Sequence, residues 1–215
     1  MNSARCRFSK MKSAGTVILA AGDFPVRGGE AWKMLAAARF VVACDGAAAA
    51  YRRRFGRWPD AIVGDMDSLA RSPRAGSCII AEDADQDTND LEKAIGWCRR
   101  KALRDITVVG AGGKREDHTI GNVFRALHYN VKIVTDTGVF YPVNGAASFR
   151  AAKGTAVSVF APDPRTKMTS KGLVWPLDDV EFSTLFKATL NRTSGTRFSV
   201  VSDRPVSVFV AIDAR

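Results

Sequence analysis

Residues 40–64 read FVVACDGAAAAYRRRFGRWPDAIVG, and this stretch decides the fold. An apolar run, Phe40–Cys44, leads through an alanine-rich segment, Gly46–Phe55, into a second apolar run, Ala61–Gly64. Short apolar runs that end in Gly or Asp favour buried β-strands, and the segment between them favours a helix. Strands that alternate with helices imply a mostly parallel sheet with helices on both faces.

The same alternation extends to both sides of this stretch. We expect further strands at Thr16–Ala21, Ser77–Ala81, Ile106–Gly110 and Val131–Thr135, and helices at Gly29–Ala38, Thr88–Leu103 and Asp117–Leu127. After Gly138 the pattern changes to β-rich runs without a convincing helix, at Ser148–Ala151, Ala156–Phe160, Gly172–Trp175, Phe198–Val201 and Val206–Ile212. Pro, Gly and Asp separate these runs, which is typical of an antiparallel sandwich or barrel.

The predicted fold is therefore an α/β N-terminal domain, with a mostly parallel sheet flanked by helices, followed by a C-terminal all-β sandwich domain. We expect residues 1–14 to be a disordered, mildly basic lead, residues 15–138 to form the α/β domain, and residues 139–215 to form the sandwich. The lead has no apolar core of the kind that a secretory signal needs, although an organelle presequence stays open.

Composition narrows the class of protein. The chain has 215 residues, of which 46% are hydrophobic, and no run approaches the roughly 18 apolar residues of a membrane-spanning helix. We therefore expect a globular protein without a membrane span. The four cysteines are scattered without a CxxC pair, so neither a zinc knuckle nor a disulfide framework is indicated, and a reducing cytoplasm is the simplest location.

The charge is unevenly distributed. The net charge is +10, yet residues 60–90 hold eight acids and only two bases. A concentrated acidic pocket on a basic body suits a divalent-metal site that also attracts polyanions such as nucleotides. A solvated basic surface without a ligand explains the excess of Lys and Arg equally well.

The acids follow the ends of predicted strands. Asp45 follows the strand Phe40–Cys44, Asp65 and Asp67 follow Ala61–Gly64, and Asp85, Asp87 and Asp90 lie before the next helix. In open parallel sheets, ligands bind beyond the carboxyl ends of the strands. Carboxylates at positions i and i+2 of a turn can bracket one hard cation such as Mg²⁺. A structural alternative is that Asp87 caps the helix with Asp90 at its third position.

A glycine-rich segment, residues 110–118 (GAGGKREDH), follows the strand Ile106–Gly110 and opens a helix. Glycines there let backbone amides approach a phosphate, and Arg115 adds positive charge. The GxxxxGK[ST] pattern of a P-loop is absent, and a plain tight turn is about as well supported. His118 beside Asp117 is a candidate catalytic group, whereas alone it would be an ordinary helix residue.

Four ordered motifs resemble those of the thiamine pyrophosphokinase family. They are Asp45–Ala47, Pro59–Ser68, Asp85–Ala94 and Gly113–His118, and Gly172–Leu177 resembles the family's β-domain motif. The resemblance extends from about Val17 to Ile212. It implies a homodimer with a thiamine pocket between subunits, and transfer of the terminal diphosphate of ATP to the hydroxyl of thiamine, giving thiamine diphosphate and AMP.

The resemblance also implies roles for individual residues. Asp65, Asp67 and Asp90 would hold Mg²⁺ with support from Asp87, and Asp117 would orient or deprotonate the thiamine hydroxyl. The residues expected near the nucleotide are Asp45, Gly46, Thr88, Lys93, Arg115 and His118, and those expected near thiamine are Gln86, Thr189 and Asn191.

The C-terminal part departs from the family pattern. The family has Ser-Asn in its thiamine-contacting loop, whereas this chain has Leu190 before Asn191 and Arg192 after it. Two alternatives stay open for this reason: a diphosphokinase acting on a related small alcohol, and a noncatalytic nucleotide or thiamine sensor. We expect Trp175, in a β-run, to pack in the sandwich core rather than against a ligand.

Two other classes of protein fit less well. A phosphatase with an aspartyl nucleophile would use Asp65 and Asp67 but would leave the other motifs unexplained. A nucleic-acid-binding module would need an aromatic-rich basic strand or a recognition helix, and neither is found in the sequence. We therefore expect neither a nucleic acid nor a membrane as partner.

Overall fold

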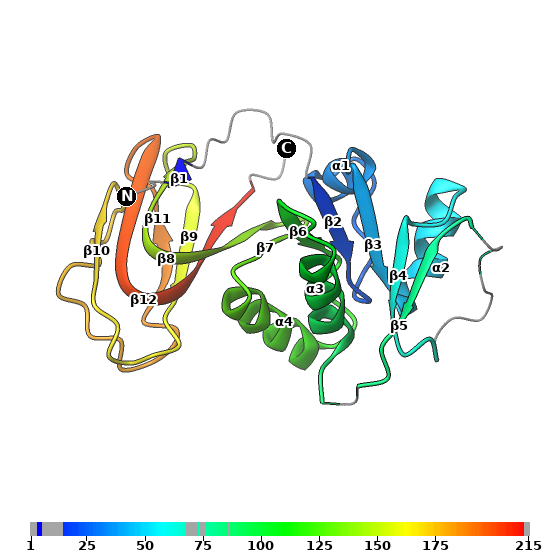
Figure 1. Ribbon diagram of the computed structural model, residues 1–215. Coiled ribbons are helices and arrows are strands. Elements are labelled where there is room, and N and C mark those ends of the chain that lie inside the picture. Colours follow the sequence, from blue (N-terminus) through cyan, green and yellow to red (C-terminus); the bar gives the residue numbers. More distant parts are fainter. Residues whose placement is uncertain (1–3, 6–14, 68–72, 74–75, 86, 213–215) are drawn as a thin grey trace. The chain divides into compact units, whose positions relative to one another are not determined.

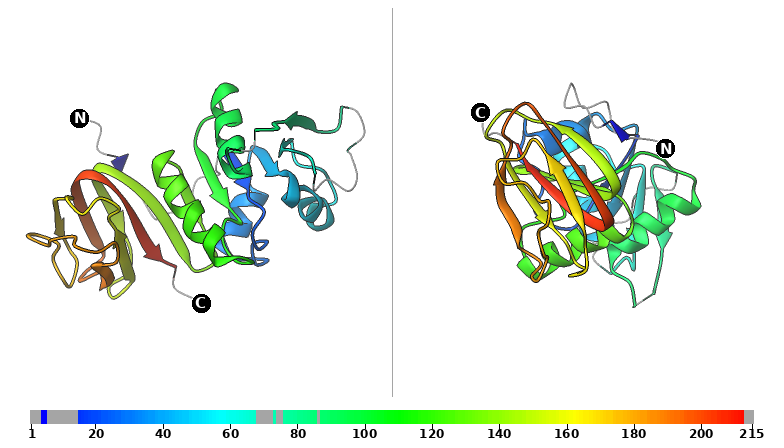
Figure 2. Two further views of the ribbon diagram at one scale, coloured as in Figure 1. Left: turned by 90° about the horizontal axis from the view of Figure 1, so that it is seen from below. Right: turned by 90° about the vertical axis from the view of Figure 1, so that its left-hand side faces the viewer.

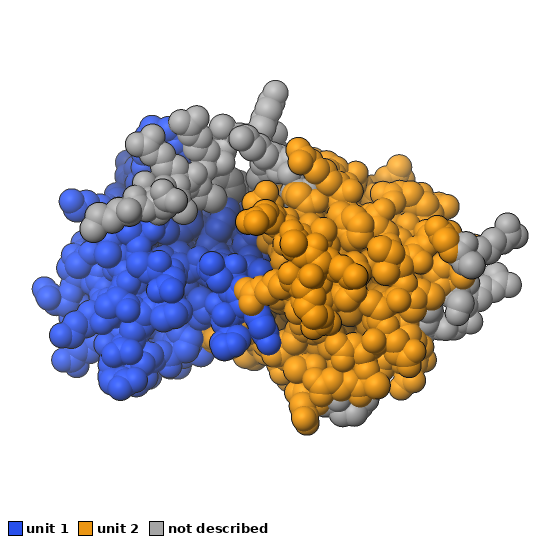
Figure 3. All heavy atoms as spheres, in the orientation of Figure 1, with its two compact units in different colours: residues 1–11, 126–132, 137–215 blue, residues 12–125, 133–136 orange. Residues whose placement is uncertain are grey.

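The computed structural model describes residues 4–5, 15–67, 73, 76–85 and 87–212 (Figures 1 and 2). The chain divides into two compact units (Figure 3). Unit 2 consists of Lys12–Arg125 and Ile133–Asp136, and unit 1 consists of Met1–Met11, Ala126–Lys132 and Thr137–Arg215. The predicted domain limits at 15–138 and 139–215 stay a prediction.

Unit 2 is built on parallel strands. The strands are β2 (Thr16–Leu19), β3 (Phe40–Cys44), β4 (Ala61–Gly64), β5 (Ile79–Glu82), β6 (Ile106–Val109) and β7 (Lys132–Val134), in the order β7-β6-β2-β3-β4-β5. The pairs β6–β2, β2–β3, β3–β4 and β4–β5 are all parallel, as predicted. The chain order reverses between β2 and β6, and in open parallel sheets such a reversal marks the ligand-binding edge.

Four helices accompany these strands: α1 (Glu30–Ala36), α2 (Asp45–Phe55), α3 (Asp90–Arg100) and α4 (Glu116–His128). The chain runs from β2 to β5 in one direction and returns to β6, so right-handed connections place α1 and α2 on one face and α3 on the other, consistent with Figure 1. The side chains of β2 and β4 are buried throughout, as strands covered on both faces require.

Strand β5 differs from the other strands. It begins two residues later than expected, and Ile79 and Ile80 are exposed by 49% and 45%. It lies at the end of the strand order, where one side has no neighbouring strand and burial is weaker. No helix of the described residues is long and apolar enough to cross a membrane.

Unit 1 is built on antiparallel strands. They are β8 (Gly138–Arg150), β9 (Ala156–Phe160), β10 (Met168–Lys171), β11 (Ala188–Arg192) and β12 (Arg197–Ala211), and Ala4–Arg5 forms a short β1 parallel to β8. Strand β12 pairs with β8 along one edge, and along its other edge with β10 at Ser199–Ser202 and with β9 at Ser207–Val210 (Figures 1 and 2).

The sequence expectations for this part are confirmed in some segments and wrong in others. The runs expected at Phe198–Val201 and Val206–Ile212 lie in strand as expected, but in one long strand that ends at Ala211, and the run expected at Ser148–Ala151 is the end of β8, which stops at Arg150. Gly172–Trp175 is not a strand, because only Leu173 forms an isolated bridge. Within the expected lead, Ala4–Arg5 forms β1, and residues 1–3 and 6–14 lie outside the described residues, so the expected disorder stays a prediction.

The expected two-sheet sandwich is a single curled sheet in unit 1. Strands β11, β9, β12 and β8 are hydrogen-bonded in that order, and β10 and β1 join β12 and β8. A register shift between Ser202 and Val206 divides β12 into two segments. One core cluster contains Phe198 from the first segment and Val208 from the second, together with Phe182 from the connection before β11. The fold thus contains parallel strands accompanied by helices in unit 2 and mainly antiparallel strands in unit 1.

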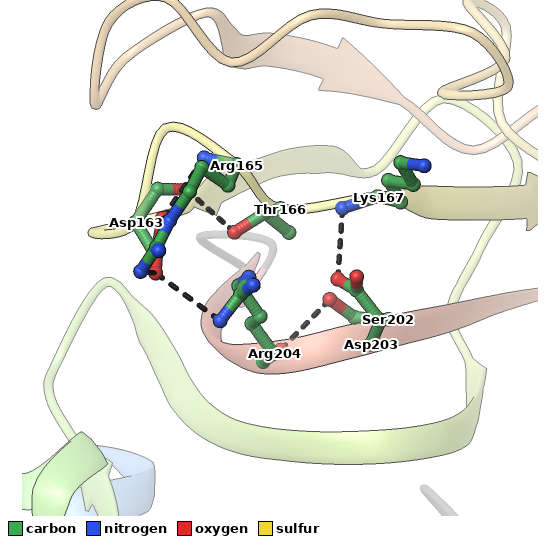
Figure 4. Close-up of polar contacts among 7 residues, drawn as sticks. All are labelled: Asp163, Arg165, Thr166, Lys167, Ser202, Asp203 and Arg204. Carbon is green, nitrogen blue, oxygen red and sulfur yellow. Dashed lines mark hydrogen bonds and ion pairs between the residues drawn. The ribbon is translucent and has the colours of Figure 1, made fainter.

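A cluster of polar side chains links the connection between β9 and β10 to the part of β12 where the register shifts, between Ser202 and Val206 (Figure 4). The Asp163 carboxylate accepts hydrogen bonds from Arg165 Nε and Nη2 at 3.0 and 2.8 Å, and lies 3.3 Å from Arg204 Nη1. Asp203 accepts from the Lys167 amide at 2.8 Å. The hydrogen bonds from Arg165 are the main reason that the pKa of Asp163 lies well below its ordinary value.

Replacing Asp163 with Asn should lower the melting temperature by about 2 °C at pH 7, because an exposed ion pair contributes little. Since the folded-state pKa is lowered, the contribution of Asp163 is complete above its ordinary value of 3.8 and is lost as the pH falls below that value. Thermal unfolding of both proteins from pH 7 to pH 3 measures this. A difference in melting temperature that stays constant down to pH 3 would contradict the assignment.

Candidate functional site

Two loops meet where the chain order reverses, one after β2 and one after β6. The amides of Gly22 and Asp23 donate to the carbonyl oxygens of Gly110 and Gly112, each at 2.8 Å. A Cβ at Gly22 would overlap with both carbonyl oxygens, and a Cβ at Gly113 would overlap with the Asp23 carboxylate. The glycines therefore allow a backbone approach that no other residue permits.

The glycine loop, Gly110–Gly113, is further fixed by Lys114. This residue adopts a left-handed backbone with φ of 55°, and its Nζ donates to the carbonyl oxygen of Ala21 at 2.7 Å. Helix α4 begins two residues later, so its free amide groups and the Arg115 guanidinium are near the loop. This arrangement suits an anion such as a phosphate.

Gly22 and Asp23 were missed in the sequence analysis. The run Thr16–Ala21 ends in Gly-Asp, the same kind of ending that drew attention to the other strands. What the sequence does not show is the contact itself, which joins residues about 90 positions apart.

Three carboxylates, those of Asp45, Asp65 and Asp90, lie near enough to one another for their charges to interact, at the ends of β3 and β4 and at the start of α3. Asp45 is 2% exposed and lies so close to Gly64 that a Cβ there would be 3.0 Å from the Asp45 side chain. Asp90 is the first residue of α3. Burial raises the pKa of Asp90, and the negative charges of Asp45 and Asp65 raise it further, while the buried Lys93 lowers it.

Burial is the main cause of the raised pKa of Asp90, and the like charges of Asp45 and Asp65 add to it. Burial, and then the negative charges of Asp90 and Asp45, raise the pKa of the Cys44 thiol, which disfavours the reactive thiolate form. Cys44, Cys78 and Cys98 are all free. Within the described ranges, no three His, Cys, Asp or Glu side chains are arranged closely enough to form a metal site.

The other two predicted metal ligands, Asp67 and Asp87, are on exposed turns. Asp67 is exposed, and its amide donates to Asp65 Oδ1 at 3.2 Å across a turn. Asp87 is also exposed, and its amide donates to Asp85 Oδ1 at 2.9 Å. The Thr88 hydroxyl donates to the other Asp85 oxygen at 2.7 Å, and this bond is the main cause of the lowered pKa of Asp85.

The helix cap is not the one considered as an alternative. Asn89, rather than Asp87, is the N-cap of α3, and Asp90 is the first helical residue rather than the third. Asn89 Oδ1 accepts from the Glu92 amide at 3.0 Å, and Glu92 Oε2 accepts from the Asn89 amide at 3.4 Å. This capping box leaves both Asp87 and Asp90 without the capping role.

Asp117 and Arg115 form an exposed pair at the start of α4. Arg115 Nε and Nη2 donate to the two carboxylate oxygens at 3.1 and 2.6 Å. This pairing lowers the pKa of Asp117. A carboxylate with a lowered pKa is a weak base, so Asp117 is better suited to orient a hydroxyl than to deprotonate it. His118 is exposed beside it.

Both described residues that were expected near thiamine are engaged inside unit 1. Asn191 is buried, its Oδ1 accepts from the Trp175 amide at 3.2 Å, and its Nδ2 donates to the Trp175 carbonyl at 2.7 Å. The Thr189 hydroxyl donates to the carbonyl oxygen of Phe186 at 2.9 Å. Gln86 lies outside the described residues.

The expectation that Trp175 packs in the core was wrong, because its side chain is 56% exposed. The reason is that Asn191 holds the Trp175 backbone in a turn beside β11, so that Trp175 follows the bridge at Leu173 instead of lying in a strand. Leu190, at the register shift of β11, has φ of 62° and is 85% exposed. Val174, Leu185 and Phe186 are also exposed.

Comparison with known proteins links both parts of the chain to one family. The family model for the thiamin pyrophosphokinase catalytic domain matches residues 31–135, and the model for the thiamin pyrophosphokinase substrate-binding domain matches residues 138–209. Thiamine pyrophosphokinase 1 of Arabidopsis thaliana is 29% identical over 169 residues, covering 67% of this chain and 62% of the relative. Thiamin pyrophosphokinase 1 of Caenorhabditis elegans is 32% identical over 100 residues, covering 43% and 41%.

The chain thus spans less than two thirds of the length of either relative. Among solved structures, the thiamin pyrophosphokinase of Candida albicans has a TM-score of 0.73 at 18% identity, covering 92% of this chain and 90% of that one. This likeness supports the fold, and the two family models together span most of the sequence. From these matches, the chain belongs to the thiamin pyrophosphokinase family.

Proposed function

We propose that this protein transfers the terminal diphosphate of ATP to the hydroxyl of thiamine, giving thiamine diphosphate and AMP. The single observation that carries the proposal is the cluster of Asp45, Asp65 and Asp90 at the carboxyl edge of the parallel sheet. Carboxylates at this edge offer the hard oxygen donors that Mg²⁺ prefers, and phosphate transfer uses a cation of this kind.

The residues present fit Mg²⁺ in their chemistry, because carboxylate oxygens are hard donors, and because a cation would offset the like charges of Asp45 and Asp65 that, after burial, raise the pKa of Asp90. Asp65, Asp67 and Asp90 would hold the ion, with Asp87 in support. When bound, Mg²⁺ neutralises charge on the phosphate oxygens. Asp67 and Asp87 would have to approach the cluster, and both are on exposed turns.

In the reaction, the hydroxyl oxygen of the acceptor forms a bond to the β-phosphorus of ATP, and the bond from that phosphorus to the oxygen bridging it to the α-phosphorus breaks. AMP leaves with the bridging oxygen, and the hydroxyl proton passes to solvent. We assign Asp117 to orienting the hydroxyl, because its lowered pKa suits it to accept a hydrogen bond. The glycine loop, Arg115 and Lys93 would hold the phosphates, with Asp45, Gly46, Thr88 and His118 near the nucleotide.

For the acceptor, unit 1 offers the exposed indole of Trp175. An aromatic face suits the rings of thiamine, and its negative quadrupole suits the cationic thiazolium. We also propose that the protein works as a homodimer. The free cysteines fit the reducing cytoplasm as its location.

One observation favours a second candidate, a diphosphokinase for a related small alcohol. The Asn191 amide is bound to the Trp175 backbone at both ends, and Leu190 stands where the family has serine. Thiamine would therefore lack two polar contacts. Competition between thiamine and other small alcohols for the same diphosphate distinguishes the two candidates.

Replacing Asp90 with Asn should lower kcat/KM for thiamine diphosphate formation by about 100-fold or more, because charge stabilisation of this kind is typically worth that much. Chromatography of products after incubation with ATP, Mg²⁺ and thiamine measures both AMP and thiamine diphosphate. Asp105→Asn is the matched control, because Asp105 precedes β6 at the opposite end of the strand and its left-handed backbone accepts Asn. Equal activity of the two variants would overturn the assignment of Asp90.

Replacing Trp175 with Ala should raise KM for thiamine about tenfold and leave KM for ATP unchanged, because one stacking contact is worth roughly 1 kcal/mol or more. Trp175→Phe should recover most of the loss. Val201→Ala, which truncates another half-exposed side chain of unit 1, serves as the control in the same steady-state assay. If Trp175→Ala changes neither KM value, the indole does not bind the acceptor.

A further inference from the structure

Two cross-links join helices α3 and α4. Asn89 Nδ2 donates to Asn122 Oδ1 at 3.4 Å, and Arg125 Nε donates to Glu92 Oε2 at 2.7 Å. The partners on each helix are three residues apart, so the two cross-links are about one helical turn apart. Neither Asn89 nor Asn122 was singled out from the sequence, and neither has a role in the proposed reaction so far.

The orientations of both side-chain amides are determined by backbone groups. Asn122 Nδ2 donates to the carbonyl oxygen of Ala111 at 2.9 Å, so Asn122 must present its oxygen to Asn89. Asn89 Oδ1 accepts from the Glu92 amide at 3.0 Å, so Asn89 must present its NH₂ group to Asn122. The two side-chain amides therefore form one series of hydrogen bonds, in which each amide can take only one orientation.

The two ends of this series of hydrogen bonds lie at two different parts of the candidate site. At one end, Ala111 belongs to the glycine loop, which is held by Gly22 and Asp23. At the other end, Asn89 is covalently bonded to Asp90, whose carboxylate interacts with Asp45 and Asp65. The expected phosphate loop and the acidic cluster are thus connected by side-chain hydrogen bonds through Asn122.

We propose that Asn89 and Asn122 are positioning residues that hold the acidic cluster and the glycine loop in fixed relation during diphosphate transfer. This inference rests on the proposed function for its kinetic consequences. Neither residue needs to touch the substrate, because a displacement of about 1 Å between reacting groups can lower a rate by 100-fold. The Glu92–Arg125 pair supports the same arrangement from the next turn.

Two single substitutions interrupt this series of hydrogen bonds, one at each asparagine. Asn89→Ser keeps a good N-cap, because a serine hydroxyl also accepts from the first turn, but removes the donor to Asn122. Asn122→Ala removes both the acceptor for Asn89 and the donor to Ala111. Asp163→Asn, in unit 1, is the control for a general loss of side-chain hydrogen bonds.

In the kinetic test, each single variant should lower kcat for thiamine diphosphate formation about tenfold, with KM for ATP changed less than about twofold. The kcat of the double variant should be no lower than that of the more impaired single variant, because both substitutions interrupt the same series of hydrogen bonds. Asp163→Asn should retain the wild-type kcat. Additive losses in the double variant, or a normal kcat in either single variant, would overturn the proposal.

A second readout does not depend on activity. Amide hydrogen exchange should accelerate about fivefold or more in both the first turn of α3 and residues 110–113, in either single variant, and in neither region of Asp163→Asn. Faster exchange only around the substituted residue would overturn the positioning role. If the wild-type protein makes no thiamine diphosphate, the proposed function fails, while the exchange experiment still decides whether the two regions are connected.

Discussion

The repulsion among Asp45, Asp65 and Asp90 is the constraint on which the rest of unit 2 depends. Three carboxylates do not gather in a half-buried place unless a rigid backbone holds them there, since burial and like charge both oppose ionisation. The backbone does so here through β3 and β4, which are almost completely buried, and through the capping box that starts α3. The destabilising charge is concentrated where a cation and phosphates would be bound, a pattern typical of functional sites.

The same edge of the sheet supplies the complementary surface. The reversal of chain order between β2 and β6 brings two glycine-containing loops together so closely that side chains are excluded. The N-terminus of α4 follows one of these loops directly, which suits the binding of an anion. Negative and phosphate-binding elements in one unit fit a metal–nucleotide complex better than a nucleic-acid duplex, whose binding would favour a positive centre. Unit 1 has an exposed tryptophan, Trp175, whose backbone is held by the Asn191 side chain.

Much of unit 2 could be predicted because its signals are local. Phe40–Cys44 and Ala61–Gly64 are short apolar runs, and the structure has strands with the same bounds. The position of Asp45, Asp65 and Asp90 followed from the rule that the carboxyl ends of parallel strands share an edge. Strand β10, with the sequence MTSK, lacks an apolar pattern, and it forms because it pairs with the distant Ser199–Ser202. The exposure of Trp175 and the Asn89–Asn122 bond likewise depend on contacts between residues 16 and 33 positions apart, which no local pattern records.

The central claim is that the diphosphate moves as one group from ATP to thiamine. The most direct measurement uses ATP labelled with phosphorus-32 at the β-position, incubated with the protein, Mg²⁺ and thiamine, and follows the label by chromatography. Transfer of the whole diphosphate predicts that the label appears in thiamine diphosphate in equal amount to unlabelled AMP. Label retained in ADP, with a single phosphate on the acceptor, or label released without any thiamine product, would contradict it.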